Sequence, residues 1–301
     1  MKNKKRWYSK KASEHIFDFF NVLTLLLFTF LCFYPFWYVI IYSFSDPRAA
    51  AVGLTLLPRG FTLDNLSEVF RLPGLAWATV ISILRTVIGS VITVYISAWF
   101  GYMMTKEKLP FRKIIYRFTI ITMYVGAGLI PWFLTMRLYG LSNSFLVYIV
   151  PSAIGVFYVI LFKTFIEQIP PALEESARMD GAGFMTCFIK IIVPLSAPII
   201  ATIFVFSAVG QWNSFFDNFI FITDERLDTL QYILFKYTRK SEFITRDINT
   251  IRLLVTGQKS IITPMTVKMT VTMVVTLPIL FVYPFAQRYF VKGIMIGAIK
   301  G

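Results

Sequence analysis

Residues 174–198 read EESARMDGAGFMTCFIKIIVPLSAP, and the interpretation of the whole chain depends on what this stretch faces. Adjacent glutamates, an Asp-Gly-Ala-Gly step and two basic residues interrupt a chain that is otherwise rich in apolar side chains. The stretch then returns to apolar sequence through Pro194. Such an interruption is typical of a polar connection between two apolar segments. The surrounding composition decides whether those segments are buried in a soluble core or embedded in a membrane.

The composition is that of an integral membrane protein. The chain has 301 residues, of which 56% are hydrophobic and 15% charged, with a mean hydropathy of +0.67, whereas soluble domains carry about 25% charged residues. The net charge of +14 comes from bases that flank apolar segments, which is how topology determinants are distributed and argues against nucleic acid as a partner. Cys32 and Cys187 are expected to be free thiols, and the single histidine, His15, excludes a zinc-type Cys/His site.

Six runs without a charged residue are each 19 to 27 residues long, and about 20 residues are enough to cross the hydrocarbon core as a helix. The first run is too long for the apolar part of a cleaved signal peptide, so it is interpreted as an uncleaved anchor. The predicted fold class is therefore an all-α membrane protein with six transmembrane helices. The predicted spans are 19–45, 76–105, 114–137, 138–162, 191–216 and 266–289.

The orientation follows from the lysines and arginines in the short connections. An even number of spans puts both termini on one side, and 17 of the 30 bases fall in or beside the segments on that side. We therefore predict that both termini are cytoplasmic. The cytoplasmic segments are then 1–18, 106–113, 163–190 and 290–301, and the external connections are 46–75 and 217–265.

The stretch quoted above thus lies between the fourth and fifth spans and faces the cytoplasm. Pro171 suits a first helical turn, acids near a helix N-terminus are favoured by its dipole, and Gly181 and Gly183 permit a turn that residues with a Cβ resist. A second short helix is expected from Phe184 to Ile192, before Pro194. From these residues alone, an amphipathic hairpin on the membrane surface is a sufficient explanation.

The same stretch resembles a motif of a known protein family, and this resemblance suggests a function. The pattern E-S-A-x-x-D-G-A followed by I-x-V-P, from Glu175 to Pro194, resembles the EAA loop of ABC importer permeases, with Ser176 and Val193 as mild departures. Three further segments resemble carbohydrate permeases of that family: Gly101–Lys113, Gln211–Ile222 (without the usual proline) and Arg288–Gly301. The chain is therefore identified as similar to the permease subunit of a maltose-type carbohydrate importer. Phe33–Pro47 and the basic tail look most like the subset that handles complex oligosaccharides.

The resemblance implies a type I importer permease fold, a bacterial cytoplasmic membrane location and a coupling helix that docks on an ATPase. The expected partners are a second, similar permease, two ABC ATPase subunits, an external solute-binding protein and a carbohydrate. No cofactor is expected in this chain, because ATP and Mg²⁺ belong to the ATPase. The one segment similar to a P-loop, Thr256–Ser260, lacks the Gly-Lys pair, so the chain is not expected to be an enzyme. The candidate coupling residues are Glu174, Glu175, Ser176, Ala177, Arg178, Asp180, Gly181, Ala182, Gly183 and Pro194.

Candidates for the substrate path are polar or aromatic groups within the predicted spans, where burial in lipid is costly. Arg85, Trp132 and Tyr139 belong to this class, although most membrane aromatics are packing residues or interface anchors. Pro131 could unwind the third span and expose carbonyl groups. The path residues we select are Gln211, Trp212, Asn213, Tyr124, Pro131 and Arg137.

Two other classes of function remain open. An ion-coupled secondary transporter normally buries carboxylates or histidines within its spans, and none of the six charge-free runs contains one. In a non-transporting scaffold, the cytoplasmic hairpin would be a docking surface only. A membrane enzyme is disfavoured by the absence of H-E-x-x-H and G-x-S-x-G motifs.

Overall fold

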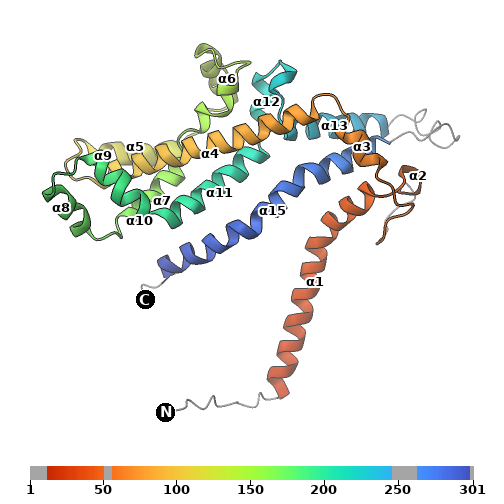
Figure 1. Cartoon of the computed structure of the whole chain (residues 1–301), viewed down its shortest axis with the longest axis horizontal. Coiled ribbons are helices and arrows are strands. Elements are labelled where there is room, and N and C mark those ends of the chain that lie inside the picture. Colours follow the sequence, from red (N-terminus) through yellow and green to blue (C-terminus); the bar gives the residue numbers. More distant parts are fainter. Residues whose placement is uncertain (1–11, 51–55, 246–262, 299–301) are drawn as a thin grey trace. The chain divides into compact units, whose positions relative to one another are not determined.

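Helices dominate the computed structural model, which describes residues 12–50, 56–245 and 263–298 (Figure 1). Across these ranges there is no strand, only an isolated antiparallel bridge between Ser45 and Phe61. Three features predicted above lie wholly or largely outside the described residues: the basic tail, Thr256–Ser260 and the extreme C-terminus. The chain divides into two compact units, residues 70–243 with 274–301, and residues 1–69 with 244–273.

The larger unit is built on three helices that pack side by side, α4 (Leu75–Thr105), α7 (Val156–Ile166) and α11 (Ala197–Asn213) (Figure 1). The helix α4 can pack closely because small residues recur on its buried face. At Gly101 a Cβ would lie 2.9 Å from the Cβ of Phe162 and 3.0 Å from the carbonyl oxygen of Val159. The remaining helices of this unit are short: α5 (Arg112–Tyr124), α6 (Leu129–Leu138), η1 (Phe145–Tyr148), η2 (Val150–Ser152), α8 (Pro171–Met179), α9 (Phe184–Cys187), the π-helix η3 (Phe188–Ile192), α10 (Val193–Leu195), α12 (Phe216–Phe221), η4 (Glu225–Leu227) and α13 (Leu230–Thr245).

Two hydrophobic clusters occupy opposite ends of α4. At its C-terminal end, side chains of α4 pack with those of α7, η3 and α11: Val94, Ala98, Tyr102, Phe162, Ile166, Phe188, Ile192 and Ile203. Toward its N-terminal end, Ile81 packs with η1 and with α12 and the residue after it. Figure 1 accordingly shows α8 and α9 beyond one end of α4, and α12 and α13 near the other.

The smaller unit contains α1 (Ala12–Ser43), α2 (Pro47–Ala50) and α3 (Asp64–Phe70). Its best-defined contact is made by Asn65, which is buried and donates to the carbonyl oxygens of Ser43 (3.0 Å) and Ser45 (2.8 Å). These bonds satisfy the carbonyl groups at the end of α1, which have no partner within the helix. The last helix, α15 (Pro264–Ala298), begins in this unit and continues into the larger one.

The helices agree with the predicted spans to different degrees. The helix α4 begins one residue before the predicted 76–105 and ends at its last residue. Within the described residues, Glu14–Ser43 and α4 are long and apolar enough to cross a membrane. Up to five spans result if each of three bent pairs counts as one, and Met265–Phe281, in the predicted sixth span, is a shorter apolar helix.

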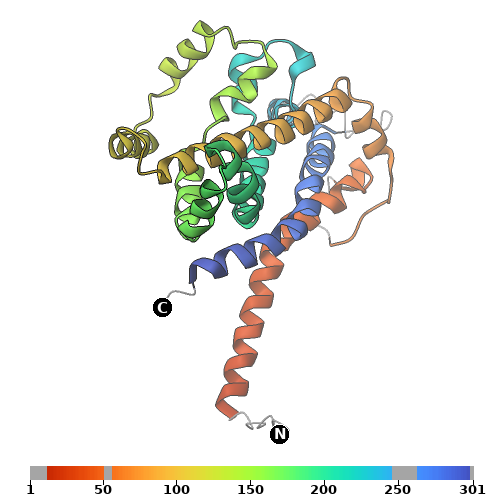
Figure 2. The same cartoon turned by 60° about the vertical axis from the view of Figure 1, so that its left-hand side comes forward.

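The bent pairs account for the main differences. The predicted span 114–137 is two helices, α5 and α6, bent by 118° at residues 125–128, and Figure 2 shows this yellow-green segment standing away from α4. Gly128, with φ +82°, allows the bend. In the predicted span 138–162, regular α-helix begins only at Val156, after two 3₁₀ turns. In the predicted span 191–216, the long helix starts at Ala197, after an 81° bend at Ser196.

Candidate functional site

The polar stretch between Pro171 and Gly183 forms a short helix with a defined end. Pro171 occupies the first position of α8. At the other end, the N–H of Gly181 donates to the carbonyl of Arg178 (3.0 Å) and the N–H of Ala182 donates to that of Ala177 (2.9 Å). This pair of bonds is a Schellman motif, and it requires the left-handed backbone that Gly181 adopts, at φ +83°. Asp180 is the C-cap residue, with helix-like φ of −76°.

One carboxylate in α8 is bound to the end of α4. Glu174 accepts a hydrogen bond from the Tyr102 hydroxyl (3.0 Å), forms an ion pair with Lys106, and accepts a bond from Arg178 one turn away (2.6 Å). Burial by itself raises the pKa of Glu174, but the hydrogen bond and charge of Lys106 outweigh it and hold the pKa below its ordinary value. Glu174 is therefore a charged anchor between two elements, and we call Tyr102, Lys106, Glu174 and Arg178 the anchor cluster.

Aromatic packing continues the anchor cluster toward the following helices. Tyr102 is fully buried, and its ring lies 4.7 Å from that of Phe184 and 5.3 Å from that of Phe188. The Lys106 ammonium lies 3.9 Å from the centre of the Tyr102 ring, within the range of a cation–π interaction. Because Glu174 precedes the turn after α8 and Phe184 and Phe188 follow it, the end of α4 contacts both sides of that turn.

The rest of α8 faces outward. Seven of its nine residues are exposed, while Glu174 and Ala177 are half-buried. Met179 is 89% exposed and Leu173 is 46% exposed. The outward face therefore presents both charge and apolar surface: Pro171, Ala172, Leu173, Glu175, Ser176, Arg178 and Met179.

The chain leaves this region through a sharp corner. The π-helix η3 leads into α10, where Pro194 is at the second position, and α11 follows after the 81° bend at Ser196. A proline cannot donate to the preceding turn, which is consistent with the irregular helix on its N-terminal side. Movement of α8 and α9 would thus be transmitted to α11 through one short connected segment.

A second group of polar residues lies toward the other end of α4. A cavity of about 490 Å³ is lined by polar and aromatic side chains from α4, α6, η2, α11 and α12. Arg85 is 3% exposed and forms an ion pair with Asp217. Its guanidinium also donates to the carbonyl of Ser214 (3.2 Å) and lies 4.5 Å from the centre of the Tyr148 ring.

Gln211 joins this ion pair to the cavity wall. Its amide oxygen accepts from Arg85 (2.9 Å), and its amide nitrogen donates to the Ser152 hydroxyl (2.6 Å). A Cβ at Gly89 would lie 2.7 Å from that nitrogen, so a larger residue at this point of α4 would displace the Gln211 amide from its present position. The orientation of Gln211 is therefore fixed by hydrogen bonds at both ends of its amide.

The other predicted path residues do not converge on Gln211. The Trp212 indole donates to the carbonyl of Val275 in α15 (3.1 Å), and the Asn213 side chain accepts from Gln231 in α13 (3.2 Å). The predicted cluster of three is thus three separate contacts, because consecutive helical residues point in different directions.

Pro131 lies in the first turn of α6, where proline is tolerated, and the break precedes it at residues 125–128. Tyr124 is 80% exposed at the end of α5, and Arg137 is exposed in the last turn of α6.

Several functional candidates were not selected from the sequence. Tyr102 and Lys106 belong to a segment that resembled the family, but spacing alone gives no sign that they meet Glu174, 72 and 68 residues away. Asp217 directly follows a charge-free run, so a count of charges treats it as the start of a connection and not as part of a site. Asp217 lies three residues after Ser214, whose hydroxyl donates to it (3.1 Å). This short spacing between two polar residues is a local sign of a polar turn.

Comparisons with known proteins agree with this architecture. Residues 97–296 match the family described as "Binding-protein-dependent transport system inner membrane component". The chain is 34% identical to Protein LplC of Bacillus subtilis, covering 98% of each chain. It is 33% identical to the polygalacturonan/rhamnogalacturonan transport system permease protein YtcP of the same organism, covering 96% of this chain and 99% of the other. Among solved structures, a chain of a bacterial ABC transporter involved in the import of the acidic polysaccharide alginate matches with a TM-score of 0.84 and 27% identity, over 94% of this chain and 99% of that one.

Proposed function

The chain belongs to the family of binding-protein-dependent transport system inner membrane components. Its relatives include transport system permease proteins for polygalacturonan/rhamnogalacturonan and for arabinooligosaccharides, and from this we propose its role. It forms half of the translocation path of an ATP-driven importer. The substrate of this importer is a carbohydrate, and more specifically an oligosaccharide. ATP and Mg²⁺ are held by two ATPase subunits. A second permease completes the path, and an external binding protein delivers the substrate.

The observation that carries this proposal is α8, a short helix tied to α4 on one side and exposed on the other. An ATPase groove would receive the outward face, where Glu175 and Arg178 offer charges and Met179 an apolar contact. Closure of the ATPase dimer would then move α8. Because Glu174 binds Lys106 and Tyr102, the movement would be passed to α4, and through η3 and α10 to α11.

The substrate path in this proposal runs along the cavity that Gln211 and Arg85 line. Arg85 and Gln211 are bonded to other groups of the chain and would hold the cavity wall in place, while the Trp132 ring, which also lines the cavity, would stack on a sugar face. Alternating access between two states of the helices would expose this cavity first to one side and then to the other.

The proposed topology places α8 and both termini in the cytoplasm of a bacterium, with six spans in its cell membrane. The bias of lysine and arginine toward the connections on that side supports this orientation. Counting each of the three bent pairs as one span brings the described helices to five, and α15 would be the sixth.

The test is to purify the full-length chain from detergent-solubilised membranes, identify the co-purifying subunits and measure their ATPase activity. We expect a second permease and an ATPase. Glu175→Ala should reduce the amount of ATPase retained, because it removes a charge from the docking face. Gly181→Val should retain the ATPase yet abolish substrate-stimulated hydrolysis, because a β-branched residue is strained at φ +83° and would change the angle between α8 and α9.

Other classes of function give different results in the same assay. A secondary transporter would purify without an ATPase, and a scaffold would retain a partner but show no substrate-dependent hydrolysis. Stimulated hydrolysis at the wild-type level in Gly181→Val would contradict the coupling role of the turn while leaving the importer assignment intact.

A further inference from the structure

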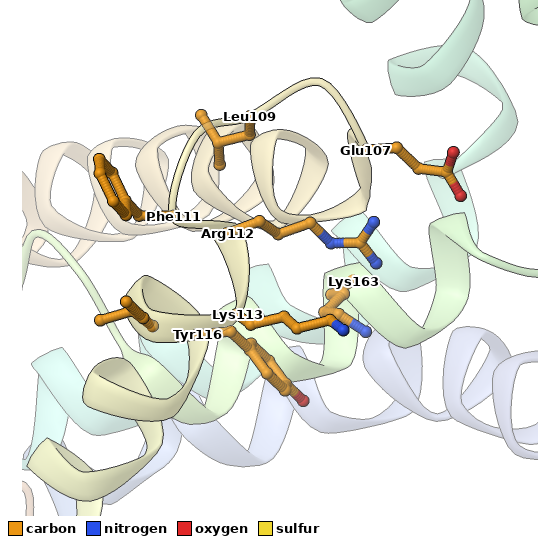
Figure 3. Close-up of a pocket in the computed structure, with 8 residues that line it drawn as sticks. Glu107, Leu109, Phe111, Arg112, Lys113, Tyr116 and Lys163 are labelled. Atoms are coloured by element: carbon orange, nitrogen blue, oxygen red, sulfur yellow. The ribbon is translucent and has the colours of Figure 1, made fainter.

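A basic cavity lies beside the α4–α5 connection, and the transport cycle proposed above does not use it. The cavity has a volume of about 690 Å³ and is lined by residues of that connection, the first turns of α5 and the end of α7: Glu107, Leu109, Phe111, Arg112, Lys113, Ile114, Tyr116 and Lys163. Figure 3 shows the side chains of Arg112, Lys113 and Lys163 extending into the same space.

Two of these three cations are not neutralised within the chain. In the part of the chain that the structure describes, no carboxylate lies within ion-pair distance of Arg112 or Lys113. Lys163 binds Glu167 (2.7 Å), and its ammonium lies 4.8 Å from the centre of the Tyr116 ring. Glu107 is the one acid in the lining, against Arg112, Lys113 and Lys163. The cavity therefore holds an excess of positive charge at the N-terminus of the 13-residue helix α5, whose dipole also favours an anion.

Apolar side chains border the same cavity and face outward. Phe111 and Ile114 line it, and they are 75% and 63% exposed. Phe111 has a left-handed backbone, φ +56°, which is rare for a bulky residue. One turn along α5 from Ile114, Phe118 is also exposed. A free phosphate ion would make no favourable contact with these apolar side chains, whereas an acyl chain would.

From the unpaired cations and the apolar border together, we infer that this cavity binds the headgroup of an anionic phospholipid from the adjacent leaflet. Arg112 and Lys113 hold the phosphate, the Tyr116 hydroxyl is placed to bond it or the polar headgroup, and Phe111 and Ile114 contact an acyl chain. This inference rests on the topology proposed above, in which the ends of α4 and α7, and with them the cavity, lie at the depth of the bilayer headgroups.

The test uses the full-length chain with the subunits that purify with it, and native mass spectrometry with added phosphatidylglycerol or phosphatidylcholine of identical acyl chains. In Arg112→Gln/Lys113→Gln we expect the affinity for phosphatidylglycerol to fall roughly 20- to 30-fold, since each base near a headgroup contributes about fivefold. The control is Lys108→Gln/Arg117→Gln, which removes two charges from the same segment but none that lines the cavity. It should lower the affinity by no more than about twofold, because distant exposed charges are screened.

The proposal is overturned if both double variants lose phosphatidylglycerol equally, or if phosphatidylcholine binds as well as phosphatidylglycerol does. Displacement of the lipid by a molar excess of inorganic phosphate would assign the cavity to a free anion instead. Loss of the ATPase from Arg112→Gln/Lys113→Gln, with unchanged lipid binding, would assign the cavity to a protein interface. Because subunit composition and lipid retention are read from the same spectra, failure of this inference is distinguishable from failure of the transport role.

Discussion

Glu174 shows how much can depend on a single side chain in a helix that is otherwise exposed. Its carboxylate has three donors, from Tyr102, Lys106 and Arg178, and two of them belong to α4 or its C-cap. Adjacent Glu175 has the same chemistry but is exposed on the outward face of α8. The two glutamates of one dipeptide therefore have separable roles, one in anchoring the helix and one in presenting it.

The first prediction compares the two glutamates by stability against pH. The pKa of Glu174 is below its ordinary value of 4.5, so its stabilising contribution is present in full above pH 4.5 and is lost as the pH falls through the lower, folded-state pKa. Glu174→Gln should remove this dependence and lower stability at neutral pH by about 1–3 kcal/mol. Glu175→Gln is the matched control and should change stability by less than about 0.5 kcal/mol.

The measurement is thermal unfolding of the purified protein in detergent between pH 8 and the acid limit of its solubility. Equal losses in the two variants would mean that the anchor cluster is not a preferred contact of α8. A Glu174→Gln protein that still lost stability through the same acid range would assign the dependence to another carboxylate.

The second prediction concerns the buried pair of Arg85 and Asp217, whose side chains are 3% and 13% exposed. Removing one member of a buried pair leaves an uncompensated charge and typically costs about 3–5 kcal/mol, whereas removing both can be nearly neutral. We therefore expect Arg85→Met to be strongly destabilising and Arg85→Met/Asp217→Leu to recover most of the loss. Additive effects in a double-mutant cycle, measured by unfolding in detergent, would show that the two groups do not interact.

At the scale of elements, the third prediction tests how closely α4 and α7 pack. A Cβ at Gly101 would be too close to both the side chain of Phe162 and the backbone of Val159, so Gly101→Ala should destabilise by about 1–3 kcal/mol through overpacking. Gly210→Ala is the control, because Gly210 is also helical but has no atom within 4 Å of the added Cβ. Alanine is the better helix former there and should be neutral or stabilising. The measurement is the unfolding midpoint of each variant. If Gly101→Ala is as stable as the wild-type protein, α7 can shift away from α4.

Which elements could be predicted from the sequence depended on how local their signals were. The bounds of α8 follow from Pro171 and the Asp180-Gly181 step, which act within a few residues, and those of α4 from two apolar runs separated only by Arg85. The break at residues 125–128 and the bend at Ser196 interrupt runs that are just as apolar, so counting charges could not detect them. The anchor cluster depends on packing between distant segments, which a single sequence does not encode in its spacing.

At the scale of the whole molecule, the two candidate regions of the larger unit are joined by the same two helices. The anchor cluster is at the C-terminal end of α4, while Arg85 lies near the other end, and α11 runs from the corner after Pro194 to Gln211. A rotation of α4 against α11 would alter the contact between Arg85 and Gln211, since this hydrogen bond joins the two helices. The coupling route proposed above, from α8 to the cavity, can therefore be carried by α4 and α11 alone.

The last prediction tests the orientation on which this route depends. Ser176 and Glu225 are both exposed and are separated by α11, the proposed fifth span. In a background carrying Cys32→Ala and Cys187→Ala, a membrane-impermeant maleimide should label Glu225→Cys in intact cells and Ser176→Cys only after permeabilisation. The reverse pattern would place α8 outside, where it could not meet an ATP-bound subunit. Labelling of both in intact cells would mean that α11 does not cross the membrane, and the coupling route from α8 through α11 would then be lost.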